Sequence, residues 1–259
     1  MTTEAVPTPR IPIVCADPSA VVGAGIFNPN QWSGVSRGII QSCWTEYSVL
    51  HHCVGQLREL CANSASSCRP HIENLQQQWR TARFDLDRII VYGQAPELHM
   101  RIEAFFAGIK TLLDLLSQLL SSEKIVAGIV DGFHRAQDAY GGKVINALDN
   151  NAVSNRKTTA VRIRGLIAEH KSLWIDRAIQ ARDLLIHPEK GMHQLMFQLD
   201  FVTNGDTIVC QRMRPPMIGP DSVDDYALST LTHAESFSLK LLTLLQEAAV
   251  SNSGMEPTR

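Results

Sequence analysis

The residues best suited to chemistry are an arginine and a histidine five positions apart, Arg182 and His187, in the sequence RDLLIH. A guanidinium is always charged and binds phosphate through two N–H groups, while an imidazole takes up or releases a proton near neutral pH. Asp183 follows the arginine directly and is placed to orient either side chain. The segment therefore predicts a site for phosphate binding and proton transfer.

This spacing alone is weak evidence. In a chain with 17 Arg and 9 His residues, an arginine followed five positions later by a histidine is expected about 0.6 times by chance. Requiring Asp, Asn or His directly after the arginine makes the match rarer, and only Arg182 meets both conditions. In the alternative interpretation, Arg182 is a solvated residue that pairs with Asp183 or Glu189, and His187 only caps a helix.

The element that positions these residues is a predicted helix from Thr158 to His187. Its apolar residues recur at helical spacing, and Pro188 disfavours helix at the histidine. Five residues of an ideal helix turn by about 500°, which leaves the arginine and the histidine about 140° apart in azimuth. One chain's pair therefore does not face one phosphate, and a bent helix end or a second subunit is needed. The helix dipole favours a protonated histidine at this end.

The N-terminal part is predicted to hold two helices. Residues 1–34 contain several prolines and glycines and are expected to form an extended arm. Helices over 35–62 and 70–92 would make a helical hairpin, residues 35–94, with the serine-rich NSASS segment between them.

The rest of the chain is predicted to form a helical domain over 95–250. Apolar residues from Ile102 to Leu120 repeat at three-and-four spacing and predict a core helix, followed by a less regular helical stretch over 124–147 and a loop over 149–155. Two segments flank Asn204-Gly205 and predict a β-hairpin. Ser222 is expected to cap a last helix, and residues 251–259 to be a disordered tail.

An Arg-[Asn/Asp/His]-x-x-x-His motif near the end of a late helix, in a mostly α helical bundle, resembles the HEPN superfamily. The resemblance covers about residues 95–250 and leaves the β-hairpin between the motif helix and the last helix as an insertion. It implies a metal-independent endoribonuclease, with no cofactor, that acts as a homodimer in a toxin or phage-defence setting. Arg182 would bind phosphate, His187 would move protons and Asp183 would orient them. Such chemistry needs a base for the 2′-OH, a cation for the phosphate and an acid for the 5′-oxygen.

Two further readings follow from the same resemblance. The alternative function is a non-catalytic helical module that dimerises or binds a partner. A toxin-like role also implies a cognate inhibitor or a partner encoded by a neighbouring gene.

A basic stripe along the motif helix bears on the substrate. Lys157, Arg164, Lys171 and Arg182 are separated by 7, 7 and 11 residues, close to whole helical turns, so they predict one stripe that leads to the motif. An RNA backbone could follow it. The competing interpretation is an ordinary solvated helix face, since acidic residues lie nearby.

Composition narrows the remaining possibilities. A net charge of −2 argues against a protein that coats nucleic acid over its whole surface. Without a signal-peptide pattern or a membrane-spanning run in the sequence, we expect a cytoplasmic protein with no membrane contact.

The six cysteines are expected to be reduced thiols. Four of them lie with three histidines between Cys43 and His71 and raise zinc as an alternative, but no ligand pairs have zinc spacing, so no metal is predicted.

Overall fold

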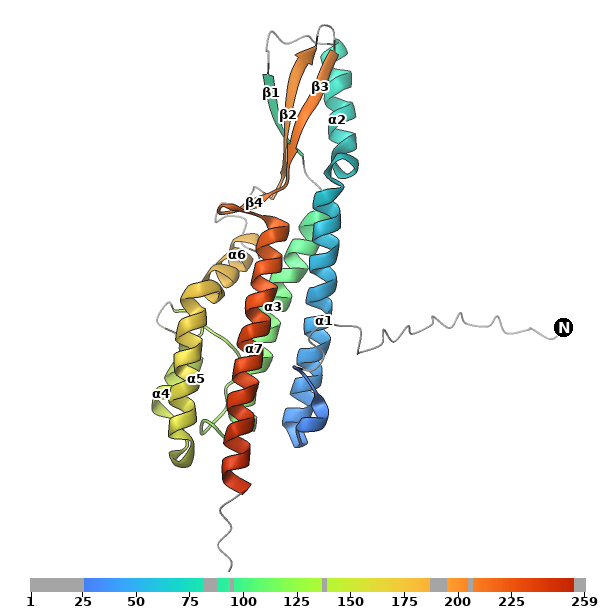
Figure 1. Ribbon diagram of the computed structural model, residues 1–259. Helices are drawn as coiled ribbons and strands as arrows, with labels where there is room; N and C mark the ends of the chain where they lie inside the picture. Colours follow the sequence, from blue (N-terminus) through green and yellow to red (C-terminus); the bar gives the residue numbers. More distant parts are fainter. Residues whose placement is uncertain are drawn as a thin grey trace, which may run out of the picture.

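A computed structural model describes residues 26–81, 88–93, 96–136, 139–186, 195–204 and 207–253. Long helices lie side by side in a bundle, and a small sheet stands at one end (Figure 1). The α-helices are α1 (Gly34–Ala62), α2 (Ser64–Thr81), α3 (Pro96–Ser122), α4 (Gly142–Asn150), α5 (Lys157–His170), α6 (Asp176–Ile186) and α7 (Val223–Ser253). The strands are β1 (Arg88–Gly93), β2 (Phe197–Asn204), β3 (Thr207–Arg214), β4 (Met217–Ile218) and β5 (Asp221–Ser222). The predicted mostly α class is confirmed.

The predicted core helix is α3, which packs against α1, α6 and α7. Its buried apolar residues form one wide face: Leu98, Ile102, Phe105, Phe106, Ile109, Leu112, Leu113, Leu116, Leu119 and Leu120. An 18-residue window of α3 is apolar enough to cross a membrane, but 56% of that window is buried inside the fold. A wide apolar face is also what a core helix of a bundle requires.

Helices α1 and α7 flank α3 and follow their predicted patterns. In α1 the buried residues Ile40, Cys43, Tyr47, Leu50, Val54 and Leu57 recur at three-and-four spacing. The α7 helix begins as expected, because the hydroxyl oxygen of Ser222 accepts a hydrogen bond from the backbone N–H of Asp225 at 3.4 Å. Both predicted helices are confirmed, although α7 continues to Ser253 into the predicted tail.

The predicted β-hairpin is confirmed, but it belongs to a larger sheet. Strands β2 and β3 are antiparallel, and β1 adds to the other edge of β2 in the order β1-β2-β3. The prediction of a helix from residue 70 to 92 is therefore wrong from Arg88 onward, while residues 82–87 lie outside the described residues. Its last apolar residues alternate between the two faces of a strand, because pairing with β2 stabilises the extended backbone.

The predicted helical hairpin is also wrong. Only Asn63 separates α1 from α2, and α2 runs onward beyond the end of α1 toward the sheet (Figure 1). Helix α2 packs against β3, and the side-chain amide of Gln76 donates to the backbone oxygen of Ile208 at 3.2 Å. The serine-rich segment lies inside α2, as does Pro70. Burial against the sheet outweighs these local signals for a helix end.

The less regular helix predicted over 124–147 is mostly absent from the described residues. After α3 the backbone takes positive φ angles at Lys124 (54°), Gly128 (97°) and Gly141 (68°), which a helix cannot accommodate. Side chains of α3 hold the segment instead, since Ser121 accepts from the N–H of Val130 at 2.7 Å and Asp114 from that of Phe133 at 2.6 Å. Helix begins again only at Gly142.

The motif helix is one helical path with an interruption. Helix α5 passes into a π turn, Lys171–Ile175, before α6. His170 at its start is 2% exposed, and its Nδ1 accepts a hydrogen bond from the indole N–H of Trp174 at 3.0 Å. The last described helical residue is Ile186, and His187 and Pro188 lie outside the described residues, so the predicted end of this helix stays a prediction.

The termini are described only in part. Of the predicted arm, residues 1–25 lie outside the described residues, and Pro29–Gln31 form a short 3-10 helix before α1. Of the predicted tail, 254–259 lie outside them, and the first three residues continue α7.

A matched pair of glycine substitutions tests the packing of α1 on α3. A β-carbon on Gly108 of α3 would lie 2.6 Å from Oε1 of Glu46 and 2.9 Å from Cδ2 of the buried Leu50, whereas one on Gly55 of α1 meets nothing within 4 Å. We expect Gly108→Ala to lower the free energy of unfolding by about 1 kcal/mol, because overpacking outweighs the gain in helix propensity. Gly55→Ala should raise it by about 0.5–1 kcal/mol. Urea denaturation measures both, and equal effects would contradict the close approach.

Acidification tests the environment of His170. Burial lowers the pKa of His170, assisted by Lys240 and His233 and opposed by Glu169. The unfolded chain therefore takes up a proton that the folded chain excludes, and the stability held above pH about 6.5 is lost as the pH falls below it. We expect His170→Gln to flatten the decline in the free energy of unfolding between about pH 7 and pH 5. The exposed His99→Gln serves as control and should keep the wild-type slope.

Candidate functional site

The carboxylate of Asp183 is the centre of a polar cluster between α6 and the segment that precedes α4. Its Oδ1 accepts from Nη1 of Arg182 at 3.1 Å. Its Oδ2 accepts from the hydroxyl of Tyr140 at 3.0 Å and from Nη2 of Arg135 at 3.2 Å. The Asp183 side chain is 18% exposed, so these contacts are partly shielded from water. Two guanidinium groups and a phenol thus converge on one carboxylate.

Tyr140 and Arg135 also bind each other. The guanidinium carbon of Arg135 lies 4.0 Å from the centre of the Tyr140 ring, and its Nη2 donates to the Tyr140 hydroxyl. Burial raises the pKa of Tyr140, as does its hydrogen bond to Asp183, while Arg135 lowers it. A higher pKa keeps the phenol protonated at neutral pH, so it donates to Asp183.

A tight turn brings Arg135 and Tyr140 together. The backbones of Ala136 and Ala139 exchange hydrogen bonds of 3.1 and 3.0 Å, and Gly141 has a φ of 68°. A β-carbon on Gly142 would lie 2.6 Å from the backbone oxygen of Ala136, so a side chain there would open the turn. Sequence reasoning missed both residues, and the Gly141-Gly142 pair after Tyr140 was the one local signal of a turn.

Arg182 is held in place but remains partly accessible. Its side chain is 33% exposed, and its Nε is buried with no hydrogen-bond partner among the described residues. The pair with Asp183 that the solvated-residue interpretation expects is present, whereas His187 and Glu189 lie outside the described residues. The structure therefore brings together two of the three predicted catalytic residues.

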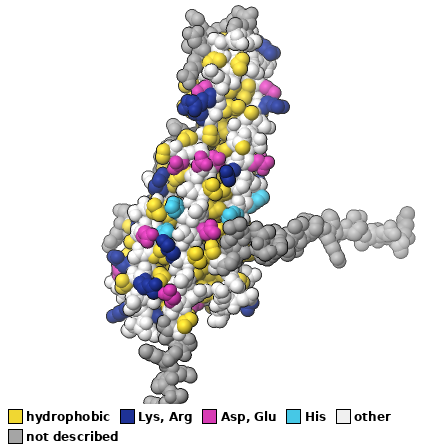
Figure 2. All heavy atoms as spheres, in the orientation of Figure 1, with side chains coloured by type: hydrophobic (Ala, Val, Ile, Leu, Met, Phe, Trp, Pro, Cys, Tyr) yellow, Lys and Arg dark blue, Asp and Glu magenta, His cyan; other side chains and the backbone are white. Residues whose placement is uncertain are grey.

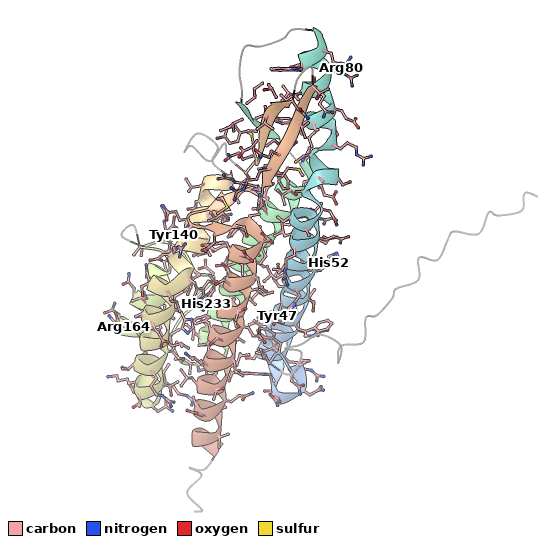
Figure 3. All side chains as sticks on the ribbon, turned by 45° about the horizontal axis from the view of Figure 1, so that its top comes forward. Tyr47, His52, Arg80, Tyr140, Arg164 and His233 are labelled. Carbon is pink, nitrogen blue, oxygen red and sulfur yellow. The ribbon has the colours of Figure 1, made fainter. Side chains whose placement is uncertain are left out.

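The predicted RNA-binding residues lie along α5 and the π turn. Lys157 is exposed at the start of α5. Arg164 pairs with Asp149 of α4 at 2.5 Å, and Lys171 pairs with Asp176 at 2.5 Å. In Figure 3 Arg164 lies farther from the sheet than Tyr140. Basic and acidic side chains are interspersed over this part of the surface in Figure 2. Acidic partners thus offset much of the charge of the stripe.

The π turn changes the direction in which Arg182 points. A π turn needs about one residue more than an α turn, so five residues of it rotate the following helix by about a quarter turn relative to a regular α-helix. Lys157 and Arg164 are seven residues apart in α5 and therefore lie on the same side of it, and Lys171 is the first residue of the π turn. Arg182 follows it and is displaced around the helix from their line. The straight stripe expected from ideal spacing therefore ends at the π turn.

The cysteines that the structure describes, all but Cys15, are buried or partly buried free thiols. Burial raises the pKa of Cys43 and Cys61 to about 12 and that of Cys68 to about 11, and a raised pKa opposes the thiolate form that binds metals. In the described parts of the chain no group of three or more His, Cys, Asp or Glu side chains is arranged to hold a metal ion.

Removal of the Asp183 carboxylate tests whether it organises the cluster. We expect Asp183→Ala to lower the free energy of unfolding by about 2 kcal/mol, because it leaves two arginines without their partly shielded partner. The exposed pair of Asp149 and Arg164 is the control, and Asp149→Ala should cost less than about 1 kcal/mol. Thermal and urea denaturation provide the comparison, and an equal effect of the two substitutions would refute the central role of Asp183.

Comparisons with family models, curated proteins and solved structures found no match for this chain. The similarity to the HEPN superfamily consequently rests on the motif, Arg182 to His187, and on the helical character of the fold around it.

Proposed function

We propose that the chain is a metal-independent endoribonuclease of the HEPN-like class, acting as a homodimer in a toxin or phage-defence setting. The observation that carries the proposal is the cluster around Asp183, which lies four residues before His187 in the sequence. It holds the guanidinium of Arg182 in a defined position at the end of α6, with part of the side chain accessible to solvent.

The contacts of Arg182 and Asp183 support separate roles for these two motif residues, and the role of His187 follows from the motif. Asp183 binds Nη1 of Arg182 and thereby orients the guanidinium, whose remaining N–H groups suit a phosphate that gains charge in the transition state. Arg135 and Tyr140 fix Asp183 in turn. In this proposal His187 moves the protons of the 2′-OH or the 5′-oxygen, because an imidazole can take up and release protons near neutral pH.

A shallow groove supports contact with the rest of an RNA strand. It has a volume of about 250 Å³, lies between α4 and α5, and is lined by Ile145, Arg164, Ala168, Lys171, Ser172 and Asp176. Two cations and a hydroxyl on one wall suit a phosphate group, and binding would compete with the acidic partners of Arg164 and Lys171. We therefore retain Lys157, Arg164 and Lys171 as proposed RNA-binding residues.

The proposal of a homodimer follows from the motif's own geometry. Arg182 and His187 are separated by about 140° around an ideal helix, so a second copy of the motif supplies the missing groups around one phosphate. A cognate inhibitor or neighbouring-gene partner and a cytoplasmic location belong to the same proposal.

A non-catalytic helical module is the second candidate, and one observation favours it. Arg182 forms an ion pair with Asp183, and a purely structural residue would do the same. In that case the cluster only secures the turn before α4 to α6, and the chain acts by binding a partner.

Incubation of the purified protein with single-stranded RNA in EDTA separates the two candidates. We expect fragments that end in 2′,3′-cyclic phosphate, and we expect His187→Ala and Arg182→Ala each to lower the cleavage rate by about 100-fold or more. The exposed Arg58→Ala in α1 is the matched control and should cleave at the wild-type rate.

Circular dichroism spectra and melting temperatures establish that the variants are folded. The enzyme proposal fails if the wild-type protein does not cleave, or if His187→Ala cleaves as fast as the wild type.

A further inference from the structure

The three-stranded sheet has one open face on which residues from all three strands line up in rows. The register places Tyr92, Gln198 and Arg214 opposite one another in the first row and Ile90, Asp200 and Arg212 in the second. Residues directly opposite in an antiparallel sheet point to the same side. A shift of register between Asp200 and Phe201 absorbs one residue of β3, so Val202 and Val209 extend the same face.

The opposite face is covered and explains why this one is open. Phe197, Leu199, Phe201 and Ile208 point to that other side and are at most 2% exposed. Helix α2 packs there, with Trp79 and Cys68 also buried. The sheet thus buries its hydrophobic side chains on the face that α2 covers. The apolar residues on the open face do not belong to a hydrophobic core.

Large side chains on the open face remain accessible to solvent. Tyr92 is 61% exposed, Ile90 is 47% and Val209 is 45%. Arg212 is exposed, and the side chain of Arg214 is 41% exposed. The sheet end of the molecule carries hydrophobic side chains with Lys and Arg among them in Figure 2. The open face therefore exposes an aromatic ring and two guanidinium groups on a sheet surface that is partly apolar.

The acidic residue on this face is hidden. Asp200 is 2% exposed, accepts a hydrogen bond from the side-chain amide of Gln198 at 2.9 Å, and lies 3.7 Å from Nη2 of Arg214. The Asp200 carboxylate pairs with Arg214 but is itself almost completely shielded from solvent. The charge that reaches solvent on these rows is consequently positive.

We propose that this open face, centred on Tyr92, Arg212 and Arg214, binds single-stranded RNA. An exposed aromatic ring stacks on a base of any kind, and neighbouring arginines contact the phosphates, which is the chemistry of sequence-tolerant single-strand binding. Tyr92 and Arg214 lie two strand spacings apart, about 10 Å, so a few nucleotides cover both. The identity of the nucleic acid as RNA rests on the proposed function, which the face would serve by holding the substrate strand.

The charge and the composition of the face favour RNA over a protein partner. A second copy of the chain would set arginines against arginines across a symmetric contact, which costs free energy. An RNA strand carries negative phosphates, which match the arginines, and flat bases, which stack on the tyrosine ring.

Binding to an RNA that cannot be cleaved tests the inference apart from catalysis. The probe is a fluorescein-labelled 2′-O-methyl RNA of about 12 nucleotides, within the usual size of a single-strand site, and the readout is fluorescence anisotropy. We expect Tyr92→Leu to weaken binding about ten-fold and Tyr92→Phe, which keeps the ring, to bind as the wild type does. Leucine preserves an apolar side chain on the strand, so the sheet should stay folded.

The salt dependence of RNA binding tests the contribution of Arg212 and Arg214. In Arg212→Gln/Arg214→Gln, the slope of log affinity against log salt should fall by about 0.7 for each phosphate contact that is lost. The double variant Arg37→Gln/Arg58→Gln in α1 removes the same charge from an exposed surface elsewhere and should bind and respond to salt like the wild type.

Three results would overturn the inference: no binding by the wild-type protein, undiminished binding by Tyr92→Leu, or a loss of dimer in size-exclusion chromatography of Tyr92→Leu without any RNA binding. The last result would identify the face as a protein contact. Absence of RNA binding by the wild-type protein, with its cleavage of short RNA intact, refutes this inference alone. Normal binding with no cleavage refutes the proposed enzyme alone.

Discussion

The burial of α3 along almost its whole length is the constraint on which the other elements depend. Because α3 has a wide apolar face, that face must be covered, and α1, α6 and α7 pack against α3. Polar side chains lie outside this face, where Asp114 and Ser121 accept hydrogen bonds from the backbone of the segment that follows and Gln118 donates to the backbone oxygen of Asp131. That segment carries Arg135 to α6, so the candidate site depends on the core helix through these three hydrogen bonds.

The ion pairs of the candidate site depend on the orientation of α6, the helix that carries Arg182 and Asp183. Asp183 balances Arg182 and Arg135 within a partly shielded environment, and the three groups remain close only while α6 keeps its rotation relative to α3. The π turn sets this rotation, and the hydrogen bond from Trp174 to the buried His170 spans it. A change in the core at His170 therefore acts on the orientation of Arg182 without touching it.

The sequence was sufficient for elements with strong periodicity and clear end signals. Helices α1, α3 and α7 bury the predicted apolar residues, and Asn204 ends β2 where the hairpin was expected. The prediction from the sequence is wrong at Ile89 and Ile90. Their spacing fits both a helix face and a strand, and the choice between the two depends on pairing with β2, which lies far along the chain.

Of the candidate site, only the residues that are neighbours in the sequence can be predicted from the sequence. Arg182 and Asp183 are adjacent in the sequence and were recognised as a pair. Arg135 and Tyr140 were not, because nothing near them indicates that their partner is a carboxylate on α6. The π turn likewise could not be predicted, since it is only five residues long and is too short for its own period to be recognised in the sequence.

The pairing of β1 with β2 also shapes how the molecule assembles. Gly93 pairs with Phe197, so the sheet joins segments separated by three of the bundle's long helical elements and must close a large loop. Such non-local contacts form slowly, after the local helical ones have reduced the entropy of the chain. On a ribosome, β1 emerges well before its partner and has no strand to pair with until β2 has been synthesised. The sheet, with its row of tyrosine and arginine, is thus a surface that the chain acquires late, after most of the bundle has formed.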